Sequence, residues 1–183
     1  HVVDNCINDL SIHGEVFDLM NLSRTPYNKI NIHIGGAYGD KVSSMERFCT
    51  NFHRLPNSVK SRLTVENDDK ASMYSVVDLY EGVYKVIGIP IVFDYHHHRF
   101  CTGGLTEEDA LEVAISTWVD IVPVVHYSES RNIEQEDDKI RPQAHSDYVR
   151  DYIDTYGNRV DIMVEAKHKE LAVLKYKEIH EIV

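Results

Sequence analysis

The feature that most constrains the fold is a regular alternation of short apolar segments with longer amphipathic segments. Strands are expected at residues 30–34, 62–66, 89–94, 121–126 and 160–165, and helices at 5–20, 40–54, 72–87, 106–118, 145–156 and 169–182. Near-continuous apolar strands that alternate with helices are typical of a parallel sheet covered by helices. The sequence therefore predicts an α/β fold.

Local signals support individual boundaries within this order. Gly35 and Gly36 close the first strand, and Pro90 stands near the start of the third strand, where it costs few ladder hydrogen bonds. Thr106 is expected to be the N-cap of its helix, with Asp109 at the third position. The acidic stretch 134–139 is expected to be a solvated loop. No linker divides the chain, so we expect one domain over residues 1–183.

Composition excludes several classes of protein. A chain of 183 residues with 43% hydrophobic content fits one globular domain. No apolar run reaches the roughly 18 residues that a membrane span needs, and the first residues lack a secretory pattern. We therefore expect an intracellular protein with no membrane partner. Three widely spaced cysteines argue against a disulfide framework and against a cysteine zinc site.

The net charge of −11 argues at first against a nucleic-acid partner, because DNA-binding surfaces are usually basic. A cluster of acidic ligands that binds divalent cations loses much of its negative charge. The count also treats all 11 histidines as neutral. The objection is therefore weakened rather than removed.

Each predicted strand ends in a group that can bind a metal. These groups are His33, Glu66, Asp94, His126 and Glu165. The carboxyl ends of parallel strands in a barrel meet on one face, where active sites are built from several strands. Taken singly, each residue is more often a helix cap or a structural side chain. Taken as a set at equivalent positions, the five residues favour a metal centre.

Two further histidines extend this set. His97 follows Asp94 in a D-x-x-H pair, and His145 stands at the start of a predicted helix, near Asp147. Imidazole and carboxylate together suit zinc, manganese or iron better than calcium or magnesium. Several divalent ions a few ångströms apart are typical of phosphodiester cleavage.

Other polar residues near the strand ends are candidates for contact with DNA. Lys41 and Lys167 could hold phosphates, Tyr95 could stack on a base, and His98 could contact phosphate. At most two of the three consecutive histidines 96–98 are expected to be ligands. Each of these residues is also compatible with an ordinary structural role.

Six segments, in this order, resemble the UV-damage endonucleases: "INIHIGGAYGDK", "RLTVENDD", "IPIVFDYHHH", "VVHYSES", "AHSDYV" and "DIMVEAKHKE". The resemblance covers almost the whole chain, from about residue 9 to residue 170. Any single segment is modest support, and six in order are strong.

The resemblance implies a TIM-barrel hydrolase that nicks damaged double-stranded DNA on the 5′ side of UV photoproducts and of some abasic sites. It implies a cluster of two or three divalent ions, Mn²⁺ first, with Zn²⁺ or Mg²⁺ as alternatives. The residues that match ligand positions are His33, Glu66, Asp94, His97, His126, His145 and Glu165. Glu66 would bridge ions at the centre of the cluster, and Glu66, His126 and Glu165 are the predicted catalytic residues.

The sequence departs from the family in two ways. Val124 stands where the family has a lysine that can be carboxylated. The barrel of the family has eight strands, and five are found here, so we expect a fragment holding the C-terminal five strand–helix units of a (β/α)8 barrel. Because two open sheet edges are then left exposed, we expect the free chain to aggregate, to dimerise or to need the missing N-terminal part of the barrel as a partner.

Two alternatives remain open from the sequence. A sugar isomerase or epimerase of the xylose isomerase-like group also places His, Glu and Asp around divalent metals at strand ends. An inactive remnant that only binds metal is the other alternative, because strands are missing.

Overall fold

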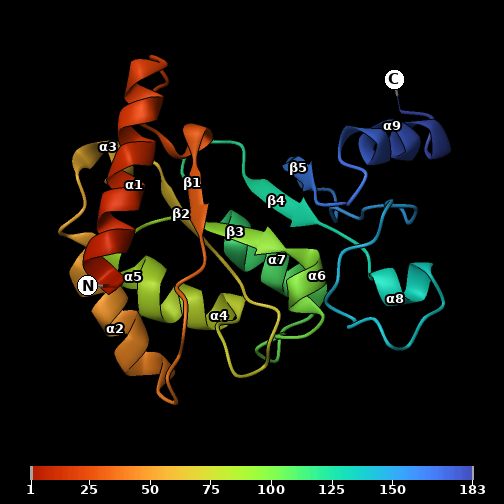
Figure 1. The fold of residues 1–183 in the computed structure, drawn as a ribbon, viewed down its shortest axis with the longest axis horizontal. Helices are drawn as coiled ribbons and strands as arrows, with labels where there is room; N and C mark the ends of the chain where they lie inside the picture. The colour runs from red at the N-terminus through yellow and green to blue at the C-terminus, as the bar shows by residue number, and fades with distance from the viewer. Residues whose placement is uncertain (1, 183) are drawn as a thin grey trace.

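A computed structural model describes residues 2–182, and the terminal residues 1 and 183 lie outside the described range. All five expected strands are present in one parallel sheet, in the order β1-β2-β3-β4-β5. The sheet curls into part of a barrel, which confirms the predicted fold class (Figure 1). The strands are β1 Ile30–Ile32, β2 Leu63–Glu66, β3 Ile91–Asp94, β4 Val124–Tyr127 and β5 Asp161–Val164.

Helices connect the strands, and most of those between β1 and β4 cover the outer side of the sheet (Figure 1). Helix α1 Val2–Leu19 and the short 3-10 turn η1 Pro26–Asn28 precede β1, and α2 Lys41–Phe52 and α3 Asn57–Lys60 lie between β1 and β2. The others are α4 Val76–Leu79, the π-helical turn η2 Tyr80–Tyr84, α5 Lys85–Ile87, α6 Tyr95–His98, α7 Glu107–Ile115, α8 Arg131–Glu134 and α9 Glu170–Ile179.

The strand register separates an outer from an inner face of the sheet. Leu63, Val65, Ile91 and Phe93 belong to the large outer core beneath the helices. The alternate positions face inward, so that Asn31 stands beside Thr64 and Asp94 beside His126. Val92, Val124 and Trp118 form a small inner apolar cluster. The polar inner side chains therefore lie above an apolar floor.

The helix expected at residues 72–87 begins later and is interrupted. Ser75 caps α4 with a capping box that involves Asp78, and the π-helical turn η2 separates α4 from α5. Gly82 lies in this turn, where an added Cβ would stand 2.5 Å from Met45 Sδ of α2. A side chain at this position would therefore force the end of the Met45 side chain to move. Gly88 ends the helix with φ of +73°, a conformation that favours glycine.

The helix expected at residues 145–156 does not form, and this prediction was wrong. Val149 and Ile153 are both buried and four residues apart, which imitates the spacing of a helix. Side-chain carboxylates accept hydrogen bonds from the backbone of this segment instead. Glu134 accepts from the N–H groups of Asp147 and Tyr148, and Glu129 accepts from the N–H groups of Arg150 and Asp151. These side-chain acceptors take the place of helical carbonyls.

The two edges of the sheet differ in burial. The edge strand β5 is exposed over Asp161, Ile162 and Met163, whereas β1, at the other edge, is buried or half-buried along its length. The cysteines Cys6, Cys49 and Cys101 are all free, as expected from their spacing. Within residues 2–182, none of the helices combines the length and the apolar character needed to cross a bilayer.

Candidate metal centre

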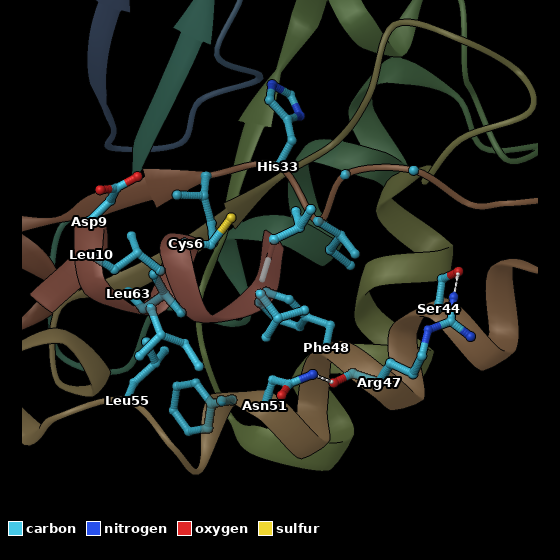
Figure 2. A pocket seen from close by; sticks show the side chains of 18 of the residues that line it. Cys6, Asp9, Leu10, His33, Ser44, Arg47, Phe48, Asn51, Leu55 and Leu63 are labelled. Atoms are coloured by element: carbon cyan, nitrogen blue, oxygen red, sulfur yellow. Dashed lines mark hydrogen bonds between the residues drawn. The ribbon is translucent and has the colours of Figure 1, made fainter.

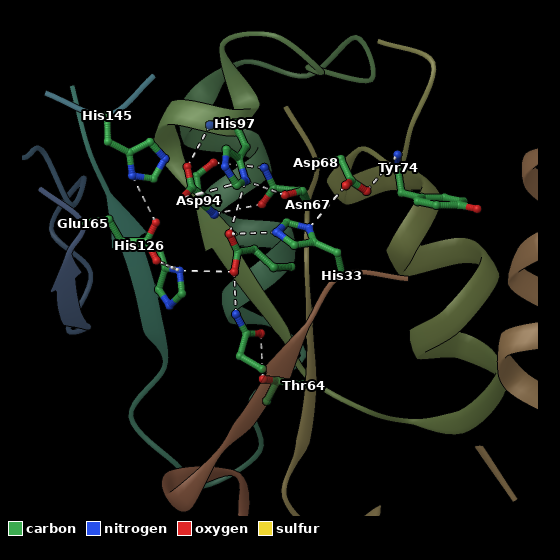
Figure 3. A network of polar contacts seen from close by, with 12 residues as sticks. His33, Thr64, Asn67, Asp68, Tyr74, Asp94, His97, His126, His145 and Glu165 are labelled. Atoms are coloured by element: carbon green, nitrogen blue, oxygen red, sulfur yellow. Dashed lines mark hydrogen bonds and ion pairs between the residues drawn. The ribbon is translucent and has the colours of Figure 1, made fainter. Parts of the chain in front are cut away.

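The predicted ligands converge at the carboxyl ends of the strands (Figure 3). His33 directly follows β1, Glu66 ends β2, Asp94 ends β3, His126 lies in β4, and Glu165 directly follows β5. His97 is on α6, and His145 lies in a loop that pairs with Ser130 through an isolated bridge. The structure therefore brings together all seven predicted residues.

Glu66 is at the centre of the cluster, and its two carboxylate oxygens face different partners. Oε1 lies 3.6 Å from Nε2 of His33 and 3.2 Å from Nδ1 of His97. Oε2 lies 3.2 Å from Nδ1 of His126 and accepts a hydrogen bond of 2.5 Å from the amide of Asn31. One carboxylate therefore joins imidazoles from both sides of β3.

A second carboxylate flanks His126 from the side of β5. Nδ1 of His126 lies 3.1 Å from Oε1 of Glu165, and Nδ1 of His145 lies 3.6 Å from Oε2 of the same residue. Glu165 therefore links the barrel strand that carries His126 to the loop that carries His145.

Asp94 caps the short helix that carries His97. Its Oδ1 accepts a hydrogen bond of 2.7 Å from the backbone N–H of His97, which fixes the spacing of the D-x-x-H pair. Its Oδ2 is buried and has no hydrogen-bond partner among the described residues. Burial raises the pKa of Asp94 to about 6, although the charge of His97 opposes the shift.

The central groups perturb one another strongly. Burial raises the pKa of Glu66, but contacts with His126 and His97 outweigh it and hold this pKa well below its usual range. Burial lowers the pKa values of His126 and His97, and their carboxylate neighbours outweigh it, so that these values rise to about 10 and about 9. Glu66 and its imidazole partners are therefore strongly coupled by their charges.

The residues fit a metal centre by geometry as well as by type. Two groups have ligand atoms that all lie within 4.8 Å of one another, and they share Glu66: one includes His33 and His97, and the other includes Asp94 and His126. Nδ1 of His126 and Oδ2 of Asp94 are buried without a hydrogen bond of acceptable geometry. Buried polar atoms are rarely left in this state unless an ion or water completes them. Imidazole and carboxylate ligands suit manganese or zinc.

Several side chains that support the ligands were not predicted. Oδ1 of Asp68 lies 3.3 Å from Nδ1 of His33, and the carbonyl of Asn67 accepts a hydrogen bond of 2.9 Å from Nδ1 of His97. Asn31 contacts Glu66 directly. Such partners orient metal ligands. Asn31 could have been found, because it precedes His33 by two residues and therefore lies on the same face of the chain.

Of the three consecutive histidines, only His97 reaches the cluster. His96 is fully buried, with its ring edge-on to Phe100 and to His145 at centroid distances of 5.2 and 5.6 Å. His98 is also buried, against Phe93. The expectation that at most two of them are ligands stays a prediction.

Two of the four residues expected to contact DNA are not at the surface. Tyr95 is fully buried and its hydroxyl donates to the carbonyl of Asp154, so it cannot stack on a base in this conformation. The buried position of His98 likewise removes it from contact with phosphate. Both expectations are corrected, because α6 turns these side chains toward the outer core. Lys167 is exposed, and Lys41 is partly exposed and paired with Asp78 at 3.1 Å.

Val124 lies below His126 on the inner face, packed with Val92 and Trp118. No ionisable group therefore stands where the sequence departs from the family pattern.

A cavity of about 500 Å³ opens beside the cluster, between α1, α2 and the loop after β1 (Figure 2). Its wall is mainly apolar, with Leu10, Phe48, Leu55 and Leu63 among the lining residues. His33 stands at its margin and is shared with the metal centre. The apolar lining makes this cavity unsuitable as a second metal site.

Comparison with known proteins agrees with the geometry. The profile of a family described as "UV-endonuclease UvdE" matches residues 1–182. The "UV DNA damage endonuclease" of Bacillus cereus (strain Q1) is 37% identical over 194 residues, which cover 100% of this chain and 56% of the relative. The protein of the same description from Bacillus anthracis is 35% identical over 188 residues and covers 96% and 55%.

A solved structure described as "Crystal Structure of SacUVDE" superposes with a TM-score of 0.81 and 32% sequence identity, over 98% of this chain and 59% of that one. The chain thus spans little more than half the length of these relatives. None of these matches favours a sugar isomerase. With a profile match along its length and a shared partial barrel, the chain belongs to the UvdE family of UV endonucleases.

Proposed function

We propose that the chain carries the metal centre of a DNA-repair endonuclease that cuts damaged double-stranded DNA on the 5′ side of UV photoproducts, with abasic sites as further substrates. The observation that carries the proposal is the position of the two carboxylate oxygens of Glu66. One oxygen faces the imidazoles of His33 and His97, and the other faces the imidazole of His126, as expected of a bridging carboxylate. The descriptions of the relatives support the class of substrate.

The cofactor that fits this cluster is a set of two or three divalent cations, with Mn²⁺ preferred and Zn²⁺ or Mg²⁺ as alternatives. When bound, such ions activate water and stabilise the leaving oxygen of a phosphodiester. The residues that would hold them are His33, Glu66, Asp94, His97, His126, His145 and Glu165.

The catalytic residues of the proposal are Glu66, His126 and Glu165. Glu66 remains ionised because imidazoles surround it, so it offers two anionic oxygens at one place. Glu165 orients His126 and His145 from the opposite side. Together they preorganise the centre, which limits the reorganisation needed when a phosphate arrives.

Contact with the DNA backbone is assigned to Lys167, which is exposed, and to Lys41, which is partly exposed and paired with Asp78. We further propose that catalysis needs the part of the relatives' length that this chain does not span, because a substrate site in a barrel is built from many strands.

The test uses a duplex with one cyclobutane dimer and a label at the 5′ end of the damaged strand. The chain is assayed alone and joined to the uncovered part of the Bacillus cereus relative, with Mn²⁺ or with EDTA. The joined protein is expected to give one labelled product that ends on the 5′ side of the dimer, in Mn²⁺ only. Glu66→Gln is expected to abolish this product.

Glu112→Gln is the matched control, because Glu112 is exposed on α7 and belongs to no ligand group. This variant should cut as the parent does. A Mn²⁺-loaded joined protein that leaves the dimer duplex intact would support an inactive remnant and contradict the proposal. Equal cutting of an undamaged duplex would contradict the assigned substrate.

A further inference from the structure

Two polar side chains lie below the metal centre, inside an otherwise apolar part of the barrel. Asn31 on β1 and Thr64 on β2 are direct neighbours in the parallel register. Thr64 is fully buried, and the inner floor beside it is formed by Val92, Val124 and Trp118. A buried hydroxyl or amide is costly unless it is hydrogen-bonded. The hydrogen-bond partners of Asn31 and Thr64 should therefore explain why polar groups are present here.

The two side chains form a hydrogen-bond chain that ends on Glu66. The hydroxyl of Thr64 donates to Oδ1 of Asn31 over 2.9 Å. This bond leaves the NH₂ group of the amide directed upward, where it donates to Oε2 of Glu66 over 2.5 Å. Glu66 fixes which group donates in each of these hydrogen bonds, because an ionised carboxylate can only accept.

The oxygen that Asn31 contacts is the one on the side of His126, whereas the other oxygen faces His33 and His97. The terminal torsion of a glutamate is broad, so an unrestrained carboxylate can turn. A turned carboxylate could present both oxygens to one cation instead of one oxygen to each of two. A donor fixed at Oε2 opposes this rotation.

We propose that Asn31, itself held by Thr64, is a positioning residue that keeps the two oxygens of Glu66 divided between two metal ions. Loss of the donor turns a bridging carboxylate into one that serves a single ion. The inference rests on the proposed function, since it assumes that Glu66 binds metal. What the inference adds is a statement about the number of bound ions and the distance between them.

The experiment titrates the metal-free chain with Mn²⁺ and measures bound metal by plasma mass spectrometry after gel filtration. Low-temperature electron paramagnetic resonance of the same samples separates two neighbouring, spin-coupled Mn²⁺ ions from isolated ions. The variants are Asn31→Leu, which removes the amide at similar size, and Thr64→Val, which removes only the hydroxyl. Thr64→Ser is the matched control, because it keeps the hydroxyl.

The parent chain and Thr64→Ser are expected to bind two Mn²⁺ ions with a coupled spectrum. Asn31→Leu should keep one ion, bind the second roughly 10- to 100-fold more weakly and lose the coupling, in the range seen for partners of metal ligands. Thr64→Val should change in the same direction by a smaller factor. Circular dichroism of each metal-free variant checks the fold, and Asn31→Ser replaces Asn31→Leu if the latter does not fold.

Two coupled ions bound by Asn31→Leu with parental affinity would overturn the inference and leave the metal centre standing. A parent chain that binds no Mn²⁺ would instead overturn the proposed function on which the inference rests.

Discussion

Nδ1 of His126 lies 3.2 Å from Oε2 of Glu66, although β3 separates the strands that carry these two residues. The contact crosses the inner face of the curled sheet, above Asp94 at the end of β3. A flat sheet would hold side chains of next-nearest strands about 9 to 10 Å apart. The curvature of the barrel therefore brings the groups of the centre within reach of common cations.

The first prediction concerns the pH dependence of stability without metal. The pKa values of His97 and His126 rise to about 9 and about 10 in the folded chain, above the ordinary value of 6.5. Their contribution to stability is therefore fully present below pH 6.5 and is lost as the pH rises through 9 and 10. Urea unfolding in EDTA should show a free energy of unfolding that falls from pH 7 to pH 9.

Metal should reverse this trend, because imidazoles bind metal only as neutral groups. The stabilisation gained from added Mn²⁺ should grow between pH 7 and pH 8.5. His53→Gln, at an exposed position after α2, should show the same dependence of stability on pH and on Mn²⁺ as the parent. Parallel pH profiles with and without Mn²⁺ would contradict the assignment of these histidines as ligands.

A second prediction concerns acid unfolding through Asp18. The guanidinium of the buried Arg62 contacts Asp18 at 2.9 Å, and Arg24 contacts the same carboxylate at 2.5 Å. Hydrogen bonds from Arg24 and then Arg62 lower the pKa of Asp18 to about 2. The contribution of Asp18 is therefore present above pH 4 and is lost as the pH falls toward 2.

Asp18→Asn should lower the urea midpoint at pH 7, and its difference from the parent should shrink between pH 4 and pH 2. Asp9→Asn, on the exposed side of the same helix, is the control and should have little effect. A constant difference across the pH range would mean that the charge of Asp18 is not what stabilises the fold.

A third prediction concerns the start of α7. The hydroxyl of Thr106 accepts a hydrogen bond of 3.1 Å from the backbone N–H of Asp109, and it donates to the side chain of Asp109 over 2.7 Å. Thr106→Ala should lower the free energy of unfolding by about 1 kcal/mol, the usual cost of a lost N-cap. Thr106→Ser should retain most of this energy, and an equal loss in both variants would show that the hydroxyl is not responsible.

The strands and the ligands at their ends could be predicted because they follow from local pattern and topology. Short β-branched segments gave the five strands, and parallel strands place their carboxyl ends on one face. The N-cap at Thr106 was also predictable, because capping depends on residues three apart.

The region 145–156 could not be predicted from local spacing. Its backbone is held by Glu129 and Glu134, which are distant in sequence, and Tyr176 of α9 contacts the N–H of Ile153. Such tertiary acceptors override a helical pattern of apolar residues. Placement of His145 beside Glu165 therefore depends on contacts that no sequence period reveals.

The supporting residues of the site were missed for a different reason. Asn67 and Asp68 carry groups that are common in loops and turns, and nothing in their spacing distinguishes a ligand partner from a cap. The buried position of Tyr95 and His98 was also not visible, because it depends on the turn of α6 away from the inner face.

The central claim is that Glu66 organises a centre of several metal ions, and metal content tests it most directly. Plasma mass spectrometry on the purified chain, loaded with Mn²⁺ and freed of excess, is compared with Glu66→Gln and Glu112→Gln. The account predicts two or more equivalents for the parent and Glu112→Gln, and less than about half an equivalent for Glu66→Gln, because a bridging ligand serves more than one ion. A parent chain without metal, or a Glu66→Gln variant with the full content, would contradict it.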